Sequence, residues 1–247
     1  MKILLYLFCS LVVGSRLPAQ SNTWEHTLTI SHLTGGFYIY TTYKPVNGAP
    51  FPSNSMYLVT DSGVVLFDTP WDSTQFQPLL DSIEVRHHKK VVLCIATHFH
   101  DDRTAGLTFL RQKGIKTYSS KMTYDLCKER NEKQSEYYFT TDTIFTIGGK
   151  RFQTYYPGEG HTKDNIIIWF DNERILYGGC LVKSMINKGL GYLADANTTA
   201  WSTSIKKILK RFPNPKYIIP GHFGWQNTKA LHHTLQLLQE YNQQQAE

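Results

Sequence analysis

The sequence is poor in cysteine, and the few cysteines stand far apart. The 247-residue chain has four, of which Cys9 lies in an apolar leader and Cys94, Cys127 and Cys180 are widely spaced. Small proteins stapled by disulfides carry even numbers of cysteines at short spacings, so this pattern excludes that class. At least one of the three remaining cysteines is therefore expected to have another role.

Long hydrophobic runs are absent beyond the start of the chain. A membrane-spanning helix needs about 20 consecutive apolar residues, and no stretch after residue 19 approaches that length. Lys2, the apolar run 3–13 and the small-residue exit 14–19 predict a secretory signal peptide over residues 1–19. A buried N-terminal helix fits less well, because the apolar residues form no stripe. We expect a periplasmic protein with no membrane contact after cleavage.

A strong charge of either sign is also lacking. The formal charge of +6 falls to +4 when Lys2 and Arg16 leave with the leader. Basic clusters such as residues 86–90 have neither interleaved aromatic residues nor a nucleic-acid-binding motif around them. Nucleic acid is therefore not an expected partner.

No linker, repeat or low-complexity tract divides residues 20–247, which predicts one α/β domain, expected to be a monomer. Strand-like and helix-like stretches follow one another in two similar halves, which predicts a four-layer αβ/βα sandwich of two sheets flanked by helices. Predicted strands lie at 28–43 (broken at 34–36), 56–60, 64–67, 91–97, 115–119, 143–147, 152–156, 165–170, 174–178 and 216–219; predicted helices follow Asp72 and Asn197, cover 104–112 and 121–130, and end the chain.

The segment 44–54 contains an Asn47-Gly48 turn signal and three prolines. Proline cannot donate a hydrogen bond to a neighbouring strand. We therefore expect a protruding loop without regular pairing.

Polar side chains follow the buried strand 91–97 directly. His98, His100, Asp101, Asp102 and Arg103 come in one run, and the alternation of an extended chain would place His98 and His100 on one side. Open α/β sheets bind ligands at the carboxyl ends of their strands. The sequence therefore predicts a metal site at this strand end.

Three later motifs each place one metal-binding side chain beside glycine or proline. His161, Cys180 and His222 stand in Gly-His-Thr, Gly-Cys and Pro-Gly-His contexts. Imidazole, thiolate and carboxylate donors suit Zn²⁺ better than hard cations. With His98, His100 and Asp102 they make six donors, more than one tetrahedral ion takes and enough for two Zn²⁺ with open positions.

These motifs together resemble the metallo-β-lactamase superfamily over essentially the whole mature chain. Arg103 and Cys180 narrow the resemblance to class B β-lactamases of subclass B1, because relatives acting on thioesters, lactones or phosphodiesters typically have His and Asp at these two places. The resemblance implies that His98, His100 and His161 hold one zinc. It implies that Asp102, Cys180 and His222 hold the second.

The same resemblance implies an activity and a substrate. Hydroxide generated at zinc near neutral pH would attack the β-lactam carbonyl of penicillins, cephalosporins and carbapenems, with Asp102 orienting it. Lys183 would pair with the carboxylate of the drug. Tyr192 stands where the family often has an asparagine that contacts the lactam carbonyl; its hydroxyl could donate there if it pointed inward, and the oxyanion role would then rest mainly on the first zinc. The 44–54 loop corresponds to a flap over the site, although an ordinary surface hairpin is an equal alternative.

Several neighbours are expected to support the donors. We expect positive charge from Arg103 beneath Asp102 and Cys180, with a simple salt bridge as the alternative. Asp68 is expected to hydrogen-bond the site loops or a ligand histidine, and Asp101 should face away from the donors. Two other function classes stay open: a hydrolase of other esters or amides, and a zinc-binding protein without turnover.

Overall fold

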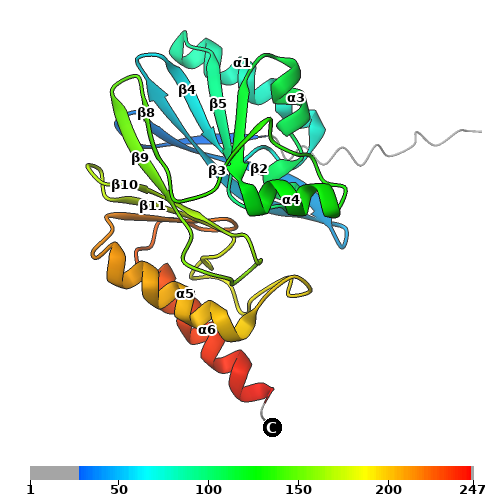
Figure 1. Ribbon diagram of the computed structural model, residues 1–247, viewed down its shortest axis with the longest axis vertical. Helices are drawn as coiled ribbons and strands as arrows, with labels where there is room; N and C mark the ends of the chain where they lie inside the picture. Colours follow the sequence, from blue (N-terminus) through cyan, green and yellow to red (C-terminus); the bar gives the residue numbers. More distant parts are fainter. Residues whose placement is uncertain (1–27, 246–247) are drawn as a thin grey trace, which may run out of the picture.

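Two mixed β-sheets pack face to face, and helices cover both outer faces, in a computed structural model that describes residues 28–245 (Figure 1). The predicted α/β sandwich is therefore confirmed. The predicted signal peptide lies outside the described residues. Within residues 28–245, no helix is long and apolar enough to cross a membrane.

The first sheet contains seven strands in sequence order. Strands β1 to β4 are antiparallel, and β4 to β7 are parallel, because a helical crossover follows each of β4, β5 and β6. The strands are β1 (Thr29–Thr34), β2 (Phe37–Val46), β3 (Ala49–Thr60), β4 (Gly63–Phe67), β5 (Val91–Ala96), β6 (Lys116–Ser120) and β7 (Tyr137–Phe139). The helices are α1 (Phe76–His87), α2 (Asp101–Thr104), α3 (Leu107–Gln112) and α4 (Lys121–Glu129).

The second sheet has five strands in the order β12-β11-β10-β9-β8. Its first four strands along the chain are antiparallel, and β12 joins β11 in parallel. The elements are β8 (Ile144–Ile147), β9 (Lys150–Tyr155), β10 (Ile167–Phe170), β11 (Ile175–Gly179), α5 (Thr198–Arg211), β12 (Tyr217–Pro220) and α6 (Ala230–Gln244). Helices α5 and α6 lie side by side on its outer face (Figure 1).

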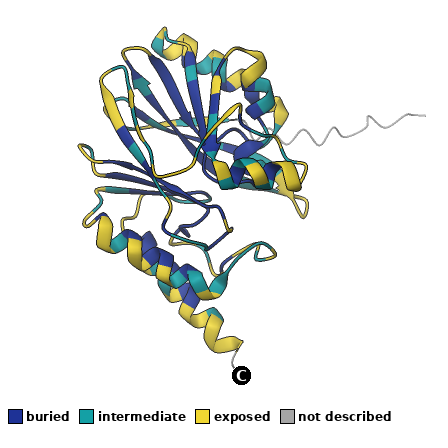
Figure 2. Cartoon of the chain, viewed as in Figure 1, coloured by how far each residue is buried: buried dark blue, intermediate teal, exposed yellow. Residues whose placement is uncertain are grey.

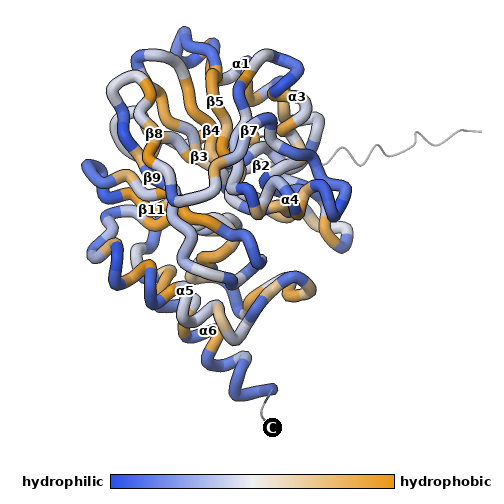
Figure 3. Tube along the Cα trace, in the orientation of Figure 1, coloured by the Kyte–Doolittle hydropathy of each residue, from blue (hydrophilic) through white to orange (hydrophobic). Residues whose placement is uncertain are grey.

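The main core lies between the two sheets. Buried residues concentrate on the facing strands (Figure 2), and these strands are rich in hydrophobic residues (Figure 3). Phe170 is fully buried there, and its ring centroid lies 4.8 Å from that of Phe37, 5.2 Å from Phe67 and 5.5 Å from Phe152. Aromatic residues from both sheets therefore interlock, which fixes the position of one sheet against the other.

Most helices form where the sequence predicts them, but the segment 104–112, predicted as one helix, holds only the end of α2 and then α3. The side chain of Asn197 accepts a hydrogen bond from the backbone N–H of Ala200 and caps α5, whose buried residues include Trp201, Ile205 and Ile208. Pro78 lies in the first turn of α1, where it removes no intrahelical hydrogen bond, so the helix begins before it. The short edge strand β7 has no strong signal in the sequence and was not predicted.

The prediction of an unpaired loop over residues 44–54 is wrong. Strands β2 and β3 continue as a regular antiparallel pair up to Val46 and Ala49. Within this hairpin, the N–H of Tyr43 donates to the side chain of Gln75, and the N–H of Asn54 donates to the carbonyl of Gly221, so both point away from the ladder. Alternate residues of a strand share this direction. Pro45, Pro50 and Pro52 occupy positions of this kind, whose nitrogen points away from the partner strand. Their missing N–H groups therefore remove no hydrogen bond between β2 and β3.

We predict that Phe170→Ala lowers the free energy of unfolding by about 3–5 kcal/mol, because it leaves a cavity between the sheets. Urea unfolding of the purified protein measures this. Val85→Ala, at a residue of α1 that is 76% exposed, is the matched control and should change the stability by less than about 0.5 kcal/mol. Equal effects of the two variants would contradict the assignment of the core.

Candidate metal centre

Four connecting segments meet at one edge of the two sheets. His98 and His100 lie between β5 and α2, His161 lies between β9 and β10, Cys180 follows β11, and His222 follows β12. Strand β5 is buried on both faces, so the first segment starts from a rigid element. The structure brings together side chains that are more than 100 residues apart in sequence.

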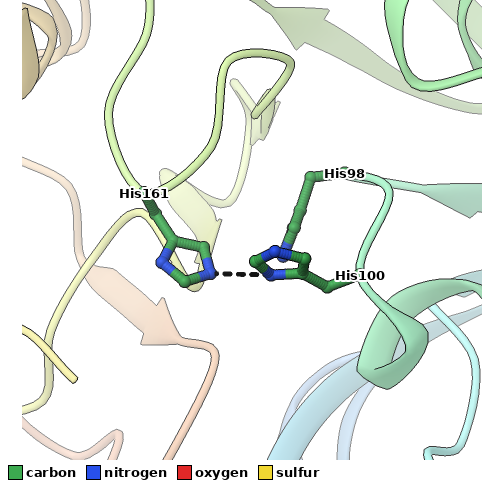
Figure 4. A group of neighbouring side chains, drawn as sticks. All are labelled: His98, His100 and His161. Atoms are coloured by element: carbon green, nitrogen blue, oxygen red, sulfur yellow. Dashed lines mark hydrogen bonds between the residues drawn. The ribbon is translucent and has the colours of Figure 1, made fainter. Parts of the chain in front are cut away.

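The first group of donors contains three histidines. One ring nitrogen from each of His98, His100 and His161 lies within 4.8 Å of the others. The three rings face a common point (Figure 4), and Nδ1 of His100 is 3.2 Å from Nε2 of His161. This arrangement suits a single metal ion held by three imidazoles.

The second group combines a carboxylate, a thiol and an imidazole. The Sγ atom of Cys180 lies 3.3 Å from Oδ2 of Asp102 and 3.2 Å from Nε2 of His222, and that nitrogen is 3.3 Å from Oδ2 of Asp102. Donor atoms of His98, Asp102 and Cys180 also lie within 4.8 Å of one another. The two groups are therefore adjacent.

Unpartnered nitrogen atoms test whether the first group fits a metal. Nε2 of His98 is buried and has no hydrogen-bond partner among the described residues, whereas in His161 it is Nε2 that faces the group and Nδ1 that is buried without a partner. Burial lowers the pKa of both histidines well below the usual value. A neutral imidazole with a free lone pair is the form that binds metals, so the residues fit a bound Zn²⁺.

Arg103 lies fully buried beneath the second group. Its guanidinium donates to Sγ of Cys180 at 3.1 Å and pairs with Oδ2 of Asp102 at 2.9 Å. It also donates to the carbonyl oxygens of Asn54 at 2.7 Å and Gly221 at 2.9 Å. Arg103 thus joins the β2–β3 hairpin to the segment after β12. Its contacts go beyond a simple salt bridge with Asp102.

Electrostatic effects on the second group oppose each other. Burial raises the pKa of Asp102, but Arg103 and His222 outweigh this effect and hold it well below its usual value. Burial raises the pKa of the Cys180 thiol, and Arg103 lowers it only in part. The carboxylate is therefore ionised at neutral pH, whereas the thiol needs a further cation to lose its proton.

Asp68 holds the end of β5 and touches no histidine. Its carboxylate accepts hydrogen bonds from the backbone N–H of Thr97 at 2.6 Å and from the hydroxyl of Tyr177 at 2.6 Å, and it lies 3.4 Å from Arg103. Burial raises its pKa to about 6 despite the arginine. Asp68 was expected to hydrogen-bond either the site loops or a ligand histidine. In the structure it bonds the site loop, at Thr97.

Asp101 points away from the donors, towards the hairpin. Its carboxylate forms an ion pair with Lys44 of β2, with an N–O distance of 2.7 Å. The ammonium group of Lys44 also lies 5.3 Å from the ring centroid of Trp71. The hairpin is thereby attached beside the metal centre.

A cavity of about 700 Å³ opens above both groups of donors. One wall is apolar and comes largely from the hairpin and the segments near it, with Val46, Phe51, Trp71 and Phe223. The lining also contains Lys183 and Tyr192. The cavity is large enough for a bicyclic small molecule with substituents.

Lys183 and Tyr192 have different environments. Lys183 is only 6% exposed, its Nζ lies 5.1 Å from the ring centroid of Trp201, and burial lowers its pKa to about 8. Tyr192 is 61% exposed at the rim, and its ring packs edge-to-face against His100 with a centroid distance of 5.6 Å. Lys183 therefore presents a fixed charge inside the cavity, and Tyr192 presents an aromatic surface at its mouth.

Sequence reasoning did not identify several contacts of the donors. The carbonyl of Pro52 accepts a hydrogen bond from Nδ1 of His222 at 2.8 Å, which leaves Nε2 for the second group. Asp195 contacts His100 of the first group, and Arg130 pairs with Asp195. No spacing signal marks these partners, because each comes from an element distant in sequence.

Comparisons with known proteins agree with this geometry. A family model described as the metallo-beta-lactamase superfamily matches residues 48–222. A metallo-beta-lactamase type 2 of Elizabethkingia meningoseptica is 44% identical over 87% of each chain, and metallo-beta-lactamase IND-1 of Chryseobacterium indologenes is 42% identical over 83% of this chain and 86% of that protein. The chain therefore belongs to the metallo-β-lactamase superfamily, and its relatives place it in subclass B1, as predicted.

Solved structures support the same assignment. A metallo-beta-lactamase from Pontibacter korlensis superposes with a TM-score of 0.84 at 36% identity and covers 86% of this chain and 99% of that one. The metallo-beta-lactamase IND-7 superposes with a TM-score of 0.83 at 41% identity, over 86% of this chain and 98% of that one. The fold of the whole described domain is thus that of the family.

We predict that Arg103→Ala destabilises the metal-free protein by about 3–5 kcal/mol, because it leaves the buried carboxylates of Asp102 and Asp68 without their cation. Urea unfolding in the presence of a chelator measures the change. Arg111→Ala, at an exposed arginine of α3, is the control and should have little effect. Similar stabilities of the two variants would show that Arg103 does not hold the site together.

Proposed function

We propose that this protein is a zinc-dependent β-lactamase that hydrolyses the cyclic amide bond of penicillins, cephalosporins and carbapenems. The observation that carries the proposal is the pair of adjacent donor groups beneath a cavity of about 700 Å³ that has a buried lysine in its wall. The subclass B1 relatives, which are named as metallo-beta-lactamases, point to the same reaction.

Two Zn²⁺ ions per chain are the proposed cofactors. His98, His100 and His161 would hold one ion, and the mixed donors Asp102, Cys180 and His222 would hold the other, in keeping with the nitrogen and sulfur ligands that zinc prefers. When bound, zinc supplies Lewis acidity that lowers the pKa of water towards about 7 and polarises a carbonyl. The protein groups around the zinc site supply the remaining roles.

Asp102 is the proposed catalytic residue. Its pKa lies well below the usual range, so it accepts hydrogen bonds at neutral pH and can orient a water molecule towards the substrate carbonyl. Arg103 holds this carboxylate at 2.9 Å and keeps it from turning away. Asp68 contributes by holding Thr97 at the end of β5.

Lys183 and Tyr192 are the proposed substrate-binding residues. β-Lactam drugs carry a carboxylate beside the reactive ring, and the ammonium of Lys183 is the buried cation in the cavity wall that would pair with it. The exposed ring of Tyr192 would contact the substituents of the drug at the rim. This role of its aromatic surface replaces the carbonyl contact that the family often makes with an asparagine.

We also propose that residues 1–19 are a cleaved signal peptide, that residues 20–247 form the single domain, and that the mature protein acts as a periplasmic monomer. The apolar run 3–13 and its small-residue exit support export. The proposed partner is the small-molecule substrate alone, without nucleic acid or membrane.

The decisive experiment uses the purified mature protein loaded with zinc and a chromogenic cephalosporin. We expect hydrolysis that a zinc chelator abolishes and that added zinc restores. Zinc binding without hydrolysis of any β-lactam would overturn the proposal and favour a zinc-binding protein or a hydrolase of other esters. A thioester and a lactone assayed in parallel distinguish these two outcomes.

The pH dependence of KM tests the role of Lys183. Burial lowers the pKa of this lysine to about 8, so its positive charge is present at pH 7 and is lost as the pH rises through 8. We expect KM for an anionic β-lactam to rise by up to about tenfold between pH 7 and pH 9, as the charged fraction falls from about nine tenths to about one tenth.

Lys183→Arg is the matched control, because arginine stays charged throughout this range. Its KM should vary little between pH 7 and pH 9. The same rise in both proteins would show that another group causes it.

A further inference from the structure

The short segment that carries Lys183 is held by side chains of the two helices on the outer face of the second sheet. The indole nitrogen Nε1 of Trp201, in α5, donates to the carbonyl of Leu181 at 2.9 Å. Two residues further on, the backbone N–H of Lys183 donates to Oγ1 of Thr234, in α6, at 2.8 Å. Each helix therefore contributes one hydrogen bond that fixes the backbone of this segment.

His233, the neighbour of Thr234 in α6, holds the same stretch of chain four residues after Lys183. Its Nε2 atom lies 2.9 Å from the carbonyl oxygen of Asn187. A carbonyl oxygen only accepts hydrogen bonds, so Nε2 of His233 is the protonated nitrogen and the donor. Lys183 and Asn187 both line the cavity above the donor groups. Two adjacent residues of α6 thus fasten one part of the cavity wall.

We propose that Thr234 and His233 are positioning residues, which fix the segment 183–187 and thereby hold the ammonium group of Lys183 in place for the carboxylate of an anionic substrate. The inference rests on the proposed function and deepens it, because Lys183 is the proposed partner of that carboxylate. It assigns a role in substrate binding to α6, a helix that contributes no donor to the metal centre.

The hydroxyl of Thr234 has a single orientation. Its Oγ1 atom lies 2.7 Å from the carbonyl oxygen of Ala230, one turn earlier in α6, and that carbonyl takes the hydroxyl proton. A lone pair of Oγ1 is then left for the N–H of Lys183. Thr234 is fully buried, so solvent does not reach this position to replace the acceptor. Without the hydroxyl, the N–H of Lys183 must find another partner, and the segment must shift to do so.

Helix α6 is a firm support for these two residues. Leu231, Leu237 and Leu238 are buried in the hydrophobic cluster that α6 shares with α5 and the second sheet. This cluster packs independently of the donor groups. The position of the backbone at Lys183 is therefore set by the core of the second half and not by a free surface loop.

The side chain of Lys183 leaves this fixed point with little freedom. It is only 6% exposed, and its Nζ atom lies 5.1 Å from the ring centroid of Trp201. A long side chain that is ordered before binding loses less entropy when it pairs with an anion. We therefore expect the two ties to α6 to affect KM for an anionic substrate and to leave kcat nearly unchanged.

The primary test is Thr234→Val, which keeps the shape of the side chain and removes the hydroxyl. KM for an anionic cephalosporin should rise about 3–10-fold, as expected for one lost neutral hydrogen bond, and kcat should stay within about twofold of the wild-type value. The methyl ester of the same cephalosporin has no carboxylate, so its KM should be equal in both proteins. Thr234→Ser keeps the hydroxyl and should restore the low KM.

His233→Ala is the second variant, because His233 is not fully buried and its loss leaves the core intact. It should raise KM for the anionic cephalosporin in the same direction and by a smaller factor. His232→Ala, at the exposed neighbour on α6, and Thr203→Val, at an exposed threonine of α5, are the matched controls and should behave as the wild type. Unfolding curves show whether each variant has folded.

Amide hydrogen exchange, read by NMR in the zinc-loaded protein, measures the tie without any substrate. In Thr234→Val the amide of Lys183 should exchange at least about tenfold faster than in the wild type, because its acceptor is gone. The amides of β11 should keep their wild-type rates.

A folded Thr234→Val protein with wild-type KM for the anionic cephalosporin would overturn the inference. An equal rise in KM for the methyl ester would do the same, because it would show a general disturbance of the cavity. If Thr234→Val does not fold, wild-type KM in His233→Ala has this meaning. A wild-type protein that hydrolyses no β-lactam would refute the proposed function instead, and an unchanged exchange rate of the Lys183 amide in Thr234→Val would then decide against the positioning role.

Discussion

The buried guanidinium of Arg103 is the interaction on which the centre depends. An arginine removed from water needs acceptors for its N–H groups, and the two terminal nitrogens of this one find them on four separate segments of the chain, while its Nε has none among the described residues. It compensates the charge of Asp102 and supports Cys180, and it connects the hairpin to the segment after β12. The second donor group could not keep its geometry around an apolar residue at this position.

The two donor groups are held by different means. In the second group, the guanidinium of Arg103 holds Cys180, and the backbone carbonyl of Pro52 in the hairpin holds His222. In the first group, burial leaves ring nitrogens of His98 and His161 without partners, and Asp195 is the charged contact. A metal ion would therefore meet two groups of donors that different contacts hold in place.

Local patterns predicted most of the fold, and the six candidate donors that they marked lie together in the structure. Apolar strands, the Asn197 cap and the glycine or proline beside each donor are local features, and the structure confirms the elements that they predict. The hairpin over residues 44–54 was mispredicted because the direction of each proline nitrogen depends on the register with the partner strand. Strand β7 was missed because it is a short edge strand whose pairing depends on β6.

The sequence by itself determined the chemistry available to this protein: three imidazoles at one strand end and its facing loop, a mixed set of three donors, a lysine near Cys180 and an arginine after Asp102. Only the tertiary structure decided which groups surround those donors. Asp195 and the carbonyl of Pro52 contact donor histidines from distant elements, and Arg130 pairs with Asp195. Such contacts leave no spacing in the sequence, because they arise only when the two sheets pack against each other and bring their loops to one edge.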